Sequence, residues 1–226
     1  MPERTRPDFL PEGPLLCVVY ASWNYIVVDK PAGLLSVPGR GEDKRDSVSE
    51  RVRYVFPEAS GSISVHRLDM DTSGLMVLGL NRKAHRGLSR QFEMRKTGKT
   101  YIAILDGIIE EDEGAVDLPL IVDWPNRPRQ MVDYERGKPS RTLYRVLERK
   151  GGTTRVEFRP LTGRTHQLRV HAATPRDRGG LGAPILGDTL YGDGTKAPRL
   201  LLHANHLAFW EPITGDWKKF YSDPPF

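Results

Sequence analysis

A short polar stretch, Val65-His-Arg-Leu-Asp-Met-Asp-Thr-Ser-Gly74, places basic, acidic and hydroxyl side chains between two apolar segments. Loops held by flanking strands are where proteins commonly display reactive groups. Asp69 and Asp71 could therefore act as the acid and the nucleophile of a glycosidase, which uses two carboxylates. The same residues also suit a structural turn, in which Asp69 caps backbone amides. The residue types alone leave catalysis and a turn as open alternatives.

Several motifs along the chain resemble those of one enzyme family. His66-Arg-Leu-Asp-x-x-Thr-Ser-Gly74 is similar to the signature of the pseudouridine synthases of the large-subunit-A type. The resemblance extends over residues 15–226, and it implies an isomerase that converts uridine in RNA to pseudouridine without a cofactor or a metal. The other motifs occur in the family's order and at similar spacing: Lys30-Pro-Ala-Gly33, Lys99-Thr-Tyr101, Val116-Asp-Leu-Pro-Leu, Asp123-Trp-Pro-Asn-Arg-Pro, Gly163-Arg-Thr-His-Gln-Leu-Arg-Val-His171, Pro184-Ile-Leu-Gly-Asp188 and Leu201-Leu-His-Ala204.

The resemblance implies a role for four side chains. Asp69 matches the catalytic carboxylate, which attacks or stabilises the sugar carbon, or takes a sugar proton, while the base is detached. Tyr101 matches an aromatic residue that stacks on the target base, and Arg169 matches the arginine that pairs with the catalytic aspartate and keeps it ionised. Arg67 matches a side chain that fills the gap left when the target base is flipped out of the RNA. Asp71 falls at a variable position of the motif.

The charge distribution predicts a polyanionic partner. Arginine accounts for 24 of the 34 basic residues, and its planar guanidinium suits phosphate oxygens. Residues 82–101 carry a net charge of +6 and residues 127–178 carry +9, whereas residues 106–123 hold seven acidic residues and no basic one. We expect a one-sided positive surface for RNA; the alternative is a set of solvated faces on a basic protein. Three arginines on one row of a helix are expected to contact phosphates beside the site: Arg82, Arg86 and Arg90.

Composition excludes several classes of protein. No run of about 18 apolar residues occurs, so no transmembrane helix is expected. The first residues lack the apolar core of a signal peptide, which predicts a cytoplasmic protein. Cys17 is the only cysteine, so no internal disulfide can form. We predict no metal site, no cofactor and a monomer. Five histidines lack the pattern of a metal site and are expected to act as hydrogen-bonding scaffold: His66, His166, His171, His203 and His206.

Three helices are predicted from their start signals. Ser47 and Glu50 form a capping box before a helix that ends at Phe56. A second helix, 82–96, begins after the capping residue Asn81, and a third, 166–173, is expected to be capped by Thr165. These few helices are expected to flank a sheet.

The rest of the pattern predicts a strand-rich α+β fold with a mixed, mainly antiparallel sheet. No flexible linker divides the chain, which predicts an N-terminal extension, 1–14, and a single catalytic domain, 15–226, without an accessory RNA-binding domain. Strands are predicted at Cys17–Tyr20, Tyr25–Pro31, Leu75–Leu80, Thr100–Leu105, Val116–Val122, Gln130–Tyr134, Thr142–Leu147, Thr154–Phe158, Leu200–Trp210 and Asp216–Tyr221.

The resemblance implies a stand-alone RNA pseudouridine synthase, and the expected lack of an accessory RNA-binding domain favours uridines in flexible hairpin loops as its targets. The resemblance implies 23S ribosomal RNA and the anticodon stem-loop of tRNA as substrates. Residues 174–183 form a longer link than the family leads us to expect, and we interpret them as an added basic loop at the RNA surface. Two alternatives stay open: a nucleic-acid N-glycosidase that uses Asp69 and Asp71, and a non-catalytic RNA-binding domain.

Overall fold

The computed structural model describes residue 11 and residues 16–41, 44–59 and 61–226. The chain forms two compact units. Unit 1 contains the described residues up to Gly98 together with His206–Asp223, and unit 2 contains Lys99–Asn205 and Pro224–Phe226. Strand β10, Leu202–Trp210, contributes residues to both units. A single catalytic domain that spans both units stays a prediction, and most of the predicted extension, 1–14, lies outside the described residues.

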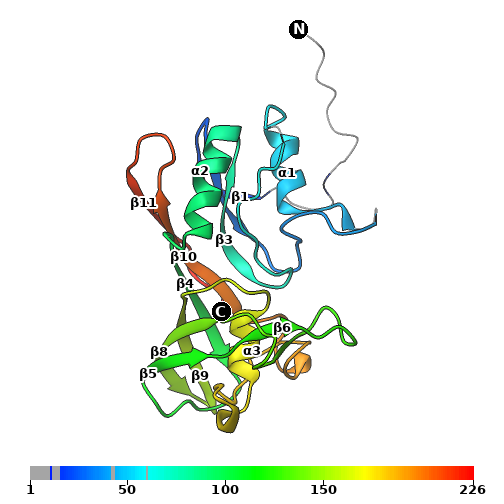
Figure 1. Ribbon diagram of the computed structural model, residues 1–226, viewed down its shortest axis with the longest axis vertical. Coiled ribbons are helices and arrows are strands. Elements are labelled where there is room, and N and C mark those ends of the chain that lie inside the picture. Colours follow the sequence, from blue (N-terminus) through cyan, green and yellow to red (C-terminus); the bar gives the residue numbers. More distant parts are fainter. Residues whose placement is uncertain (1–10, 12–15, 42–43, 60) are drawn as a thin grey trace. The chain divides into compact units, whose positions relative to one another are not determined.

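Unit 1 is built on paired strands, of which two adjacent ones are buried (Figure 1). Strand β2, Tyr25–Lys30, pairs antiparallel with β1, Cys17–Ala21, on one side and with β3, Ser73–Gly79, on the other. All seven residues of β3 are buried, as a continuous apolar run predicts for a central strand. The hydrogen-bonded order continues from β3 to β10, and β11, Trp217–Tyr221, pairs antiparallel with β10.

Two α-helices lie in the described part of unit 1. Helix α1, Val48–Val55, begins at Ser47, whose side chain accepts a bond from Glu50 N as predicted. The Glu50 carboxylate pairs with Arg53. Helix α2, Arg82–Glu93, begins at the predicted cap, Asn81, but the expectation that it runs to Lys96 is wrong. The backbone of Arg95 has a φ of 56°, a left-handed conformation that ends the helix.

Helix α2 lies close against the sheet of unit 1. Leu88 is fully buried in a cluster with residues of β2, β3 and β10. The end of β3 is a glycine, because a Cβ at Gly79 would lie only 2.6 Å from His85 N in the first turn of α2. The glycine therefore allows the helix that carries Arg82, Arg86 and Arg90 to start directly beside the strand.

Unit 2 contains a second set of paired strands, in the hydrogen-bonded order β10-β4-β9-β8-β5. These are β4, Gly98–Leu105; β9, Thr153–Pro160; β8, Arg141–Lys150; and β5, Glu113–Asp117. The predicted strand Val116–Val122 is wrong as a single element. Pro119 has no amide hydrogen for a sheet ladder, so β5 ends at Asp117, and Leu120–Val122 forms a separate strand, β6. Strand β6 pairs with β7, Gln130–Val132, in a two-stranded hairpin.

One α-helix covers the sheet of unit 2, and two short 3₁₀ turns follow it. Helix α3, Gln167–Ala173, packs Leu168 and Ala172 into the core cluster of this unit. The prediction that Thr165 caps it is wrong: His166 occupies the cap position, with a left-handed φ of 53° and no side-chain cap bond. The 3₁₀ turns span Arg176–Arg178, within the predicted loop, and Gly194–Lys196.

Candidate active site

Asp69 lies in a loop, residues 65–72, whose backbone is held on both sides of it. We call this segment the reactive loop. Before Asp69, the Ser36 hydroxyl donates to Leu68 O at 2.6 Å and accepts from Leu68 N at 3.0 Å. After Asp69, Lys30 Nζ donates to Met70 O at 2.7 Å. Asp69 therefore stands between two fixed peptide groups and is itself partly exposed.

The ammonium group of Lys30 is the centre of the second anchor. Lys30 is fully buried, and its Nζ donates to three carbonyl oxygens, of Pro31 at 2.9 Å, Leu34 at 2.7 Å and Met70 at 2.7 Å. Gly33 N donates to Met70 O as well, at 2.9 Å. A buried ammonium is costly unless its hydrogen bonds are satisfied, and these carbonyls satisfy it. Lys30 thus joins the end of β2, the following turn and the reactive loop.

His66 fixes the start of the reactive loop. Its Nε2 accepts a hydrogen bond from Val77 N in β3 at 3.1 Å. Its ring stacks on Phe92 of α2, with centroids 4.3 Å apart and planes 12° from parallel. His66 therefore acts as hydrogen-bonding scaffold, as the sequence predicts. Arg67, the next residue, is exposed.

Tyr101 extends from strand β4 in unit 2. Its Cα lies opposite that of Phe158 in β9. The ring packs against the core cluster of unit 2 but is only half-buried. Partial burial fixes the ring while leaving part of it accessible, which suits a residue that stacks on a nucleobase.

Arg169 projects from α3 and is held by a carboxylate. Only 3% of its surface is exposed. Its Nε donates to Asp188 Oδ2 at 2.8 Å, and its Nη2 donates to Asp188 Oδ1 at 2.7 Å. The Tyr191 ring covers the guanidinium, whose Cζ lies 5.3 Å from the ring centroid. This bidentate geometry fixes both the position and the plane of the guanidinium.

Asp188 is buried and remains a carboxylate at neutral pH. Burial alone would raise the pKa of Asp188, but the hydrogen bonds and charge of Arg169 outweigh it, and the pKa lies below its ordinary value. The amides of Leu190 and Tyr191 also donate to Asp188 Oδ1, at 2.9 and 3.0 Å. Gly187, with a φ of +74°, makes the turn before it, and a Cβ there would lie 1.9 Å from a backbone oxygen.

The predicted catalytic residues lie in different units. Asp69 belongs to unit 1, whereas Tyr101 and Arg169 belong to unit 2. Within unit 2, Arg169 pairs with Asp188. The pairing of Arg169 with Asp69 and the stacking of Tyr101 on a base stay predictions.

Comparisons with known proteins decide the family. Residues 24–174 match the model of a family described as RNA pseudouridylate synthase. The chain belongs to this family. The dual-specificity RNA pseudouridine synthase RluA of Pasteurella multocida (strain Pm70) is 48% identical over 222 residues, which cover 96% of each chain. RluA of Escherichia coli (strain K12) is also 48% identical, over 220 residues and 96% of each chain.

Solved structures agree with this assignment. The human RNA pseudouridylate synthase domain containing 1 superposes with a TM-score of 0.76 at 30% identity, covering 96% of this chain and 87% of that one. The predicted α+β fold class is therefore confirmed. The chain is an isomerase that converts uridine in RNA to pseudouridine. Membership of the family favours this function over a glycosidase and over a non-catalytic RNA-binding domain.

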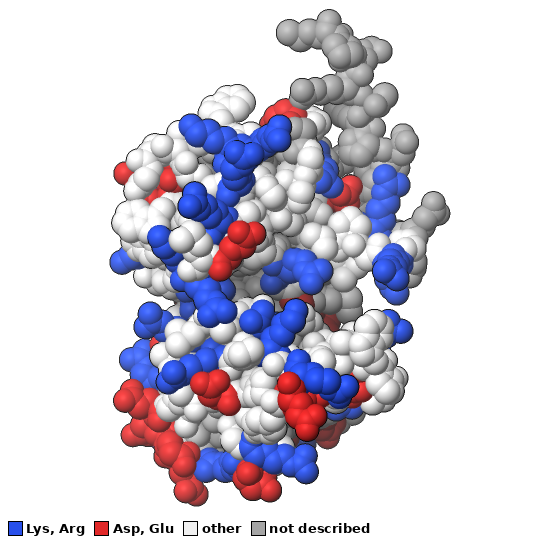
Figure 2. Space-filling view, viewed as in Figure 1, with Lys and Arg blue, Asp and Glu red and all other residues white. Residues whose placement is uncertain are grey.

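The synthase carries a row of basic side chains on α2. Arg82, Arg86 and Arg90 recur every four residues on this helix, and all three are exposed. No carboxylate of the described residues lies within 4.0 Å of their guanidinium groups. Figure 2 shows basic side chains gathered over the face of unit 1 on which α2 lies, and acidic ones gathered near β5 in unit 2. The row is available to RNA phosphates; its binding to them stays a prediction.

Other histidines of the synthase also act as scaffold. His171 Nε2 lies 2.9 Å from the Ser140 hydroxyl, and His166 Nδ1 lies 2.8 Å from the Tyr191 hydroxyl. Burial is the main cause that lowers the pKa of His171, to about 4. In the described part of the chain, no three His, Cys, Asp or Glu side chains cluster as metal ligands, and no helix is long and apolar enough to span a membrane.

Sequence reasoning missed the groups that support the reactive residues. Asp188 and Lys30 were recognised only as parts of motifs, without a role. A signal was present for both, since each is a charged residue beside apolar neighbours and close to a glycine turn. Ser36 gave no such signal, because its role depends on a backbone segment 32 residues away.

Proposed function

We propose that Asp69 is the catalytic carboxylate of this RNA pseudouridine synthase, with Tyr101 stacking on the uracil and Arg169 keeping the carboxylate ionised. The observation that carries this proposal is the double anchoring of the reactive loop, by Ser36 before Asp69 and Lys30 after it. A carboxylate on a fixed backbone needs no reordering when the substrate binds. Asp71 lies in the same loop but outside these anchors.

The reaction requires two bond changes at one sugar carbon. The bond between C1′ and N1 breaks, the uracil turns, and a bond forms between C1′ and C5. C5 releases its hydrogen as a proton and N1 takes up a proton, so the product is an isomer of uridine. Asp69 would act at the sugar while the base is detached, either as a nucleophile or as a base.

We further propose that the substrates are uridines in hairpin loops of 23S ribosomal RNA and of tRNA anticodon stem-loops. Relatives described as dual-specificity RNA pseudouridine synthases support this breadth. We propose that the enzyme works as a monomer, which sedimentation at micromolar concentration would test, and that it acts in the cytoplasm, where these RNAs are found.

The assignment of Asp69 is tested with hairpin RNA that carries tritium at C5 of the target uridine. We expect Asp69→Asn to lower tritium release by about 10⁴-fold, the scale seen when a catalytic group is removed. Asp71→Asn is the matched control, since it makes the same change in the same loop, and it should retain activity. Equal activity of Asp69→Asn and the wild type would remove Asp69 from the mechanism. Release of free uracil would indicate a glycosidase instead.

Base flipping by Arg67 is tested on structured RNA. Extruding a base costs a few kcal/mol, and a guanidinium that fills the gap offsets part of this cost. Arg67→Ala should therefore reduce turnover about tenfold on a closed hairpin and less on an unstructured oligonucleotide that contains the same uridine. An equal effect on both RNAs would argue against this role.

A further inference from the structure

The β6–β7 hairpin presents an exposed aromatic ring beside a cation. Trp124, in the loop of the hairpin, is 64% exposed, and the Arg127 guanidinium lies 4.4 Å from the centroid of its ring. The loop is closed by backbone bonds: Asp123 N donates to Arg129 O at 3.0 Å, and Arg129 N donates to Asn126 O at 3.0 Å. The Asn126 amide also donates to both oxygens of Asp123. The ring and the guanidinium are thus displayed on a well-braced loop.

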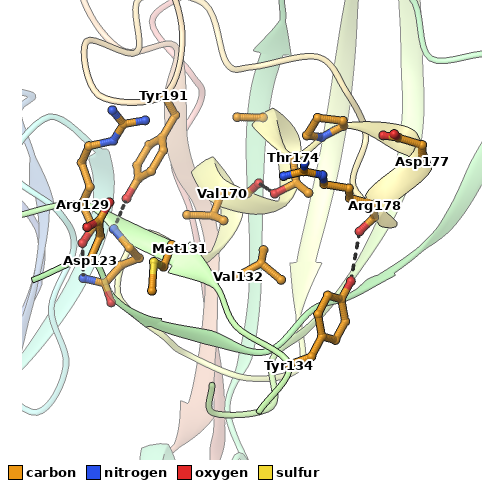
Figure 3. Close-up of a pocket in the computed structure, with 13 residues that line it drawn as sticks. Asp123, Arg129, Met131, Val132, Tyr134, Val170, Thr174, Asp177, Arg178 and Tyr191 are labelled. Carbon is orange, nitrogen blue, oxygen red and sulfur yellow. Dashed lines mark hydrogen bonds between the residues drawn. The ribbon is translucent and has the colours of Figure 1, made fainter. Parts of the chain in front are cut away.

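An open groove of about 750 Å³ lies beside this hairpin, entirely within unit 2 (Figure 3). Met131 and Val132 of β7 and Val170 of α3 form its apolar lining. Arg129 and Tyr191 lie at one end of it, and Tyr134 and Arg178 lie at the other. The Arg129 Cζ lies 5.4 Å from the centroid of the Tyr191 ring, and at the other end the Tyr134 hydroxyl donates to Arg178 O at 3.2 Å.

The arginines of this region differ from others in the same unit. No carboxylate of the described residues lies within 4.0 Å of the guanidinium of Arg127, Arg129 or Arg178, and all three are exposed. By contrast, Arg145 pairs with Glu157 at 3.2 Å and Arg149 pairs with Asp112 at 2.7 Å. Charges that the fold leaves uncompensated are available to neutralise an external anion.

This combination of groups fits single-stranded nucleic acid. Bases stack on aromatic rings and on guanidinium planes, while unpaired arginines bind the phosphates between them. Exposed guanidinium groups without a carboxylate partner among the described residues favour a polyanion over a protein segment. We propose that Trp124, Arg127, Arg129, Tyr134 and Arg178, here called the hairpin platform, bind a single-stranded segment of the RNA substrate beside the target uridine. The proposal rests on the RNA-modifying function and adds a binding surface to it.

One aromatic ring connects the hairpin platform with Arg169. The Tyr191 centroid lies 5.4 Å from Cζ of Arg129 and 5.3 Å from Cζ of Arg169. The Tyr191 hydroxyl accepts a bond from Gln130 N in β7 at 2.7 Å. An RNA strand in the groove therefore ends one ring away from Arg169, the side chain predicted to support the catalytic aspartate.

The test compares two pairs of substitutions that remove the same charge. Arg127→Gln with Arg178→Gln removes two unpaired guanidinium groups, whereas Arg141→Gln with Arg145→Gln removes two exposed ones that face carboxylates. For the first pair, affinity for the hairpin RNA should fall about tenfold. The slope of log affinity against log salt should also fall by about 1.4, at about 0.7 for each phosphate contact with single-stranded RNA. The control pair should leave both quantities unchanged.

Stacking is tested separately at Trp124. Trp124→Ala should weaken RNA binding about tenfold, the scale of one lost stack between a base and an aromatic ring. RNA with 4-thiouridine beside the target uridine should form photocrosslinks to residues 123–136 in the wild type and lose them in the variant. Melting temperatures equal to that of the wild type would show that each variant is folded.

The outcomes separate this proposal from the proposed function. If the wild type releases tritium but the platform variants bind RNA like the control pair, the hairpin platform is not an RNA site. A platform-dependent dimer in sedimentation, with unchanged RNA affinity, would assign the surface to a second copy and overturn the proposal. If the wild type binds RNA through the hairpin platform but releases no tritium, the proposed substrate is wrong, whereas the RNA-binding role of the platform is supported.

Discussion

Two buried cations, Lys30 in unit 1 and Arg169 in unit 2, are bound by their surroundings in different ways. Lys30 in unit 1 donates to three neutral carbonyl oxygens, and these bonds fix the backbone of the reactive loop. Arg169 in unit 2 faces the carboxylate of Asp188 in a bidentate pair, and what this pair fixes is the guanidinium itself. Lys30 therefore fixes the position of a loop, whereas Arg169 is a charge whose own position is fixed.

The largest effect on stability is expected when the Arg169 guanidinium is removed. Arg169→Leu leaves Asp188 buried without its cation, so the free energy of unfolding should fall by about 3–5 kcal/mol. Activity should fall as well if Arg169 supports Asp69. Urea unfolding measures the first effect and tritium release the second. Arg169→Leu with Asp188→Leu removes both charges and should recover stability but not activity; recovery of both would make the pair purely structural.

The two units should differ in their stability to acid. His171 in unit 2 is buried, with its pKa lowered to about 4 from an ordinary 6.5, so the folded state favours its neutral form. The stability it contributes is complete above pH 6.5 and is lost as pH falls from 6.5 to 4, a loss of about 3 kcal/mol. Hydrogen exchange at pH 7 and pH 4.5 should therefore show unit 2 opening first.

His171→Gln is the matched variant for the acid experiment. It keeps a polar side chain near Ser140 but cannot be protonated, so stability should no longer depend on pH between 6.5 and 4. An unchanged slope would mean that another group causes the loss. The low pKa of Asp188 adds a second loss only as pH falls below its ordinary value of 3.8.

A smaller loss of stability is expected when the Lys30 ammonium group is removed. Lys30→Met leaves carbonyl oxygens of Pro31 and Leu34 without this donor, while Met70 O keeps the bond from Gly33 N. The free energy of unfolding should fall by about 1–3 kcal/mol. Turnover should fall more than RNA affinity, because the reactive loop loosens while the phosphate contacts predicted for α2 are not affected. Equal losses in both quantities would contradict a role specific to the reactive loop.

The smallest effect on stability is expected at an exposed ion pair. Arg145 pairs with Glu157 at the surface, with 61% of its side chain exposed. Exposed ion pairs contribute about 0–1 kcal/mol, so Arg145→Gln should change stability within that range. A larger change, measured by the same urea unfolding, would show that exposed and buried cations of this fold cannot be ranked by burial.

The sequence predicted the elements better than their ends. The apolar run of β3 and the caps Ser47 and Asn81 are local signals, and each placed its element correctly. The end of α2 and the cap of α3 depend on left-handed residues, Arg95 and His166, that nothing in their residue types announces. Tertiary packing imposes such conformations, and a single sequence does not contain them as a pattern.

The site shows the same limit. Motifs pointed to Asp69 and Arg169, whose catalytic roles stay predictions. They did not identify Asp188 as the partner of Arg169, because that contact joins positions 19 residues apart through a turn. The hairpin platform was equally hidden, since Arg129 and Arg178 come from segments that only the fold brings to one groove.

The double anchoring of the reactive loop also bears on how variants of this enzyme should be classified. Residues 30–36 contain none of the groups predicted to touch RNA, yet they set the stiffness of the peptide on which Asp69 sits. A substitution there would leave substrate capture intact and appear in kinetics as a slow chemical step. Screens that measure only RNA binding would not detect such variants, because their defect is a less rigid backbone at Asp69.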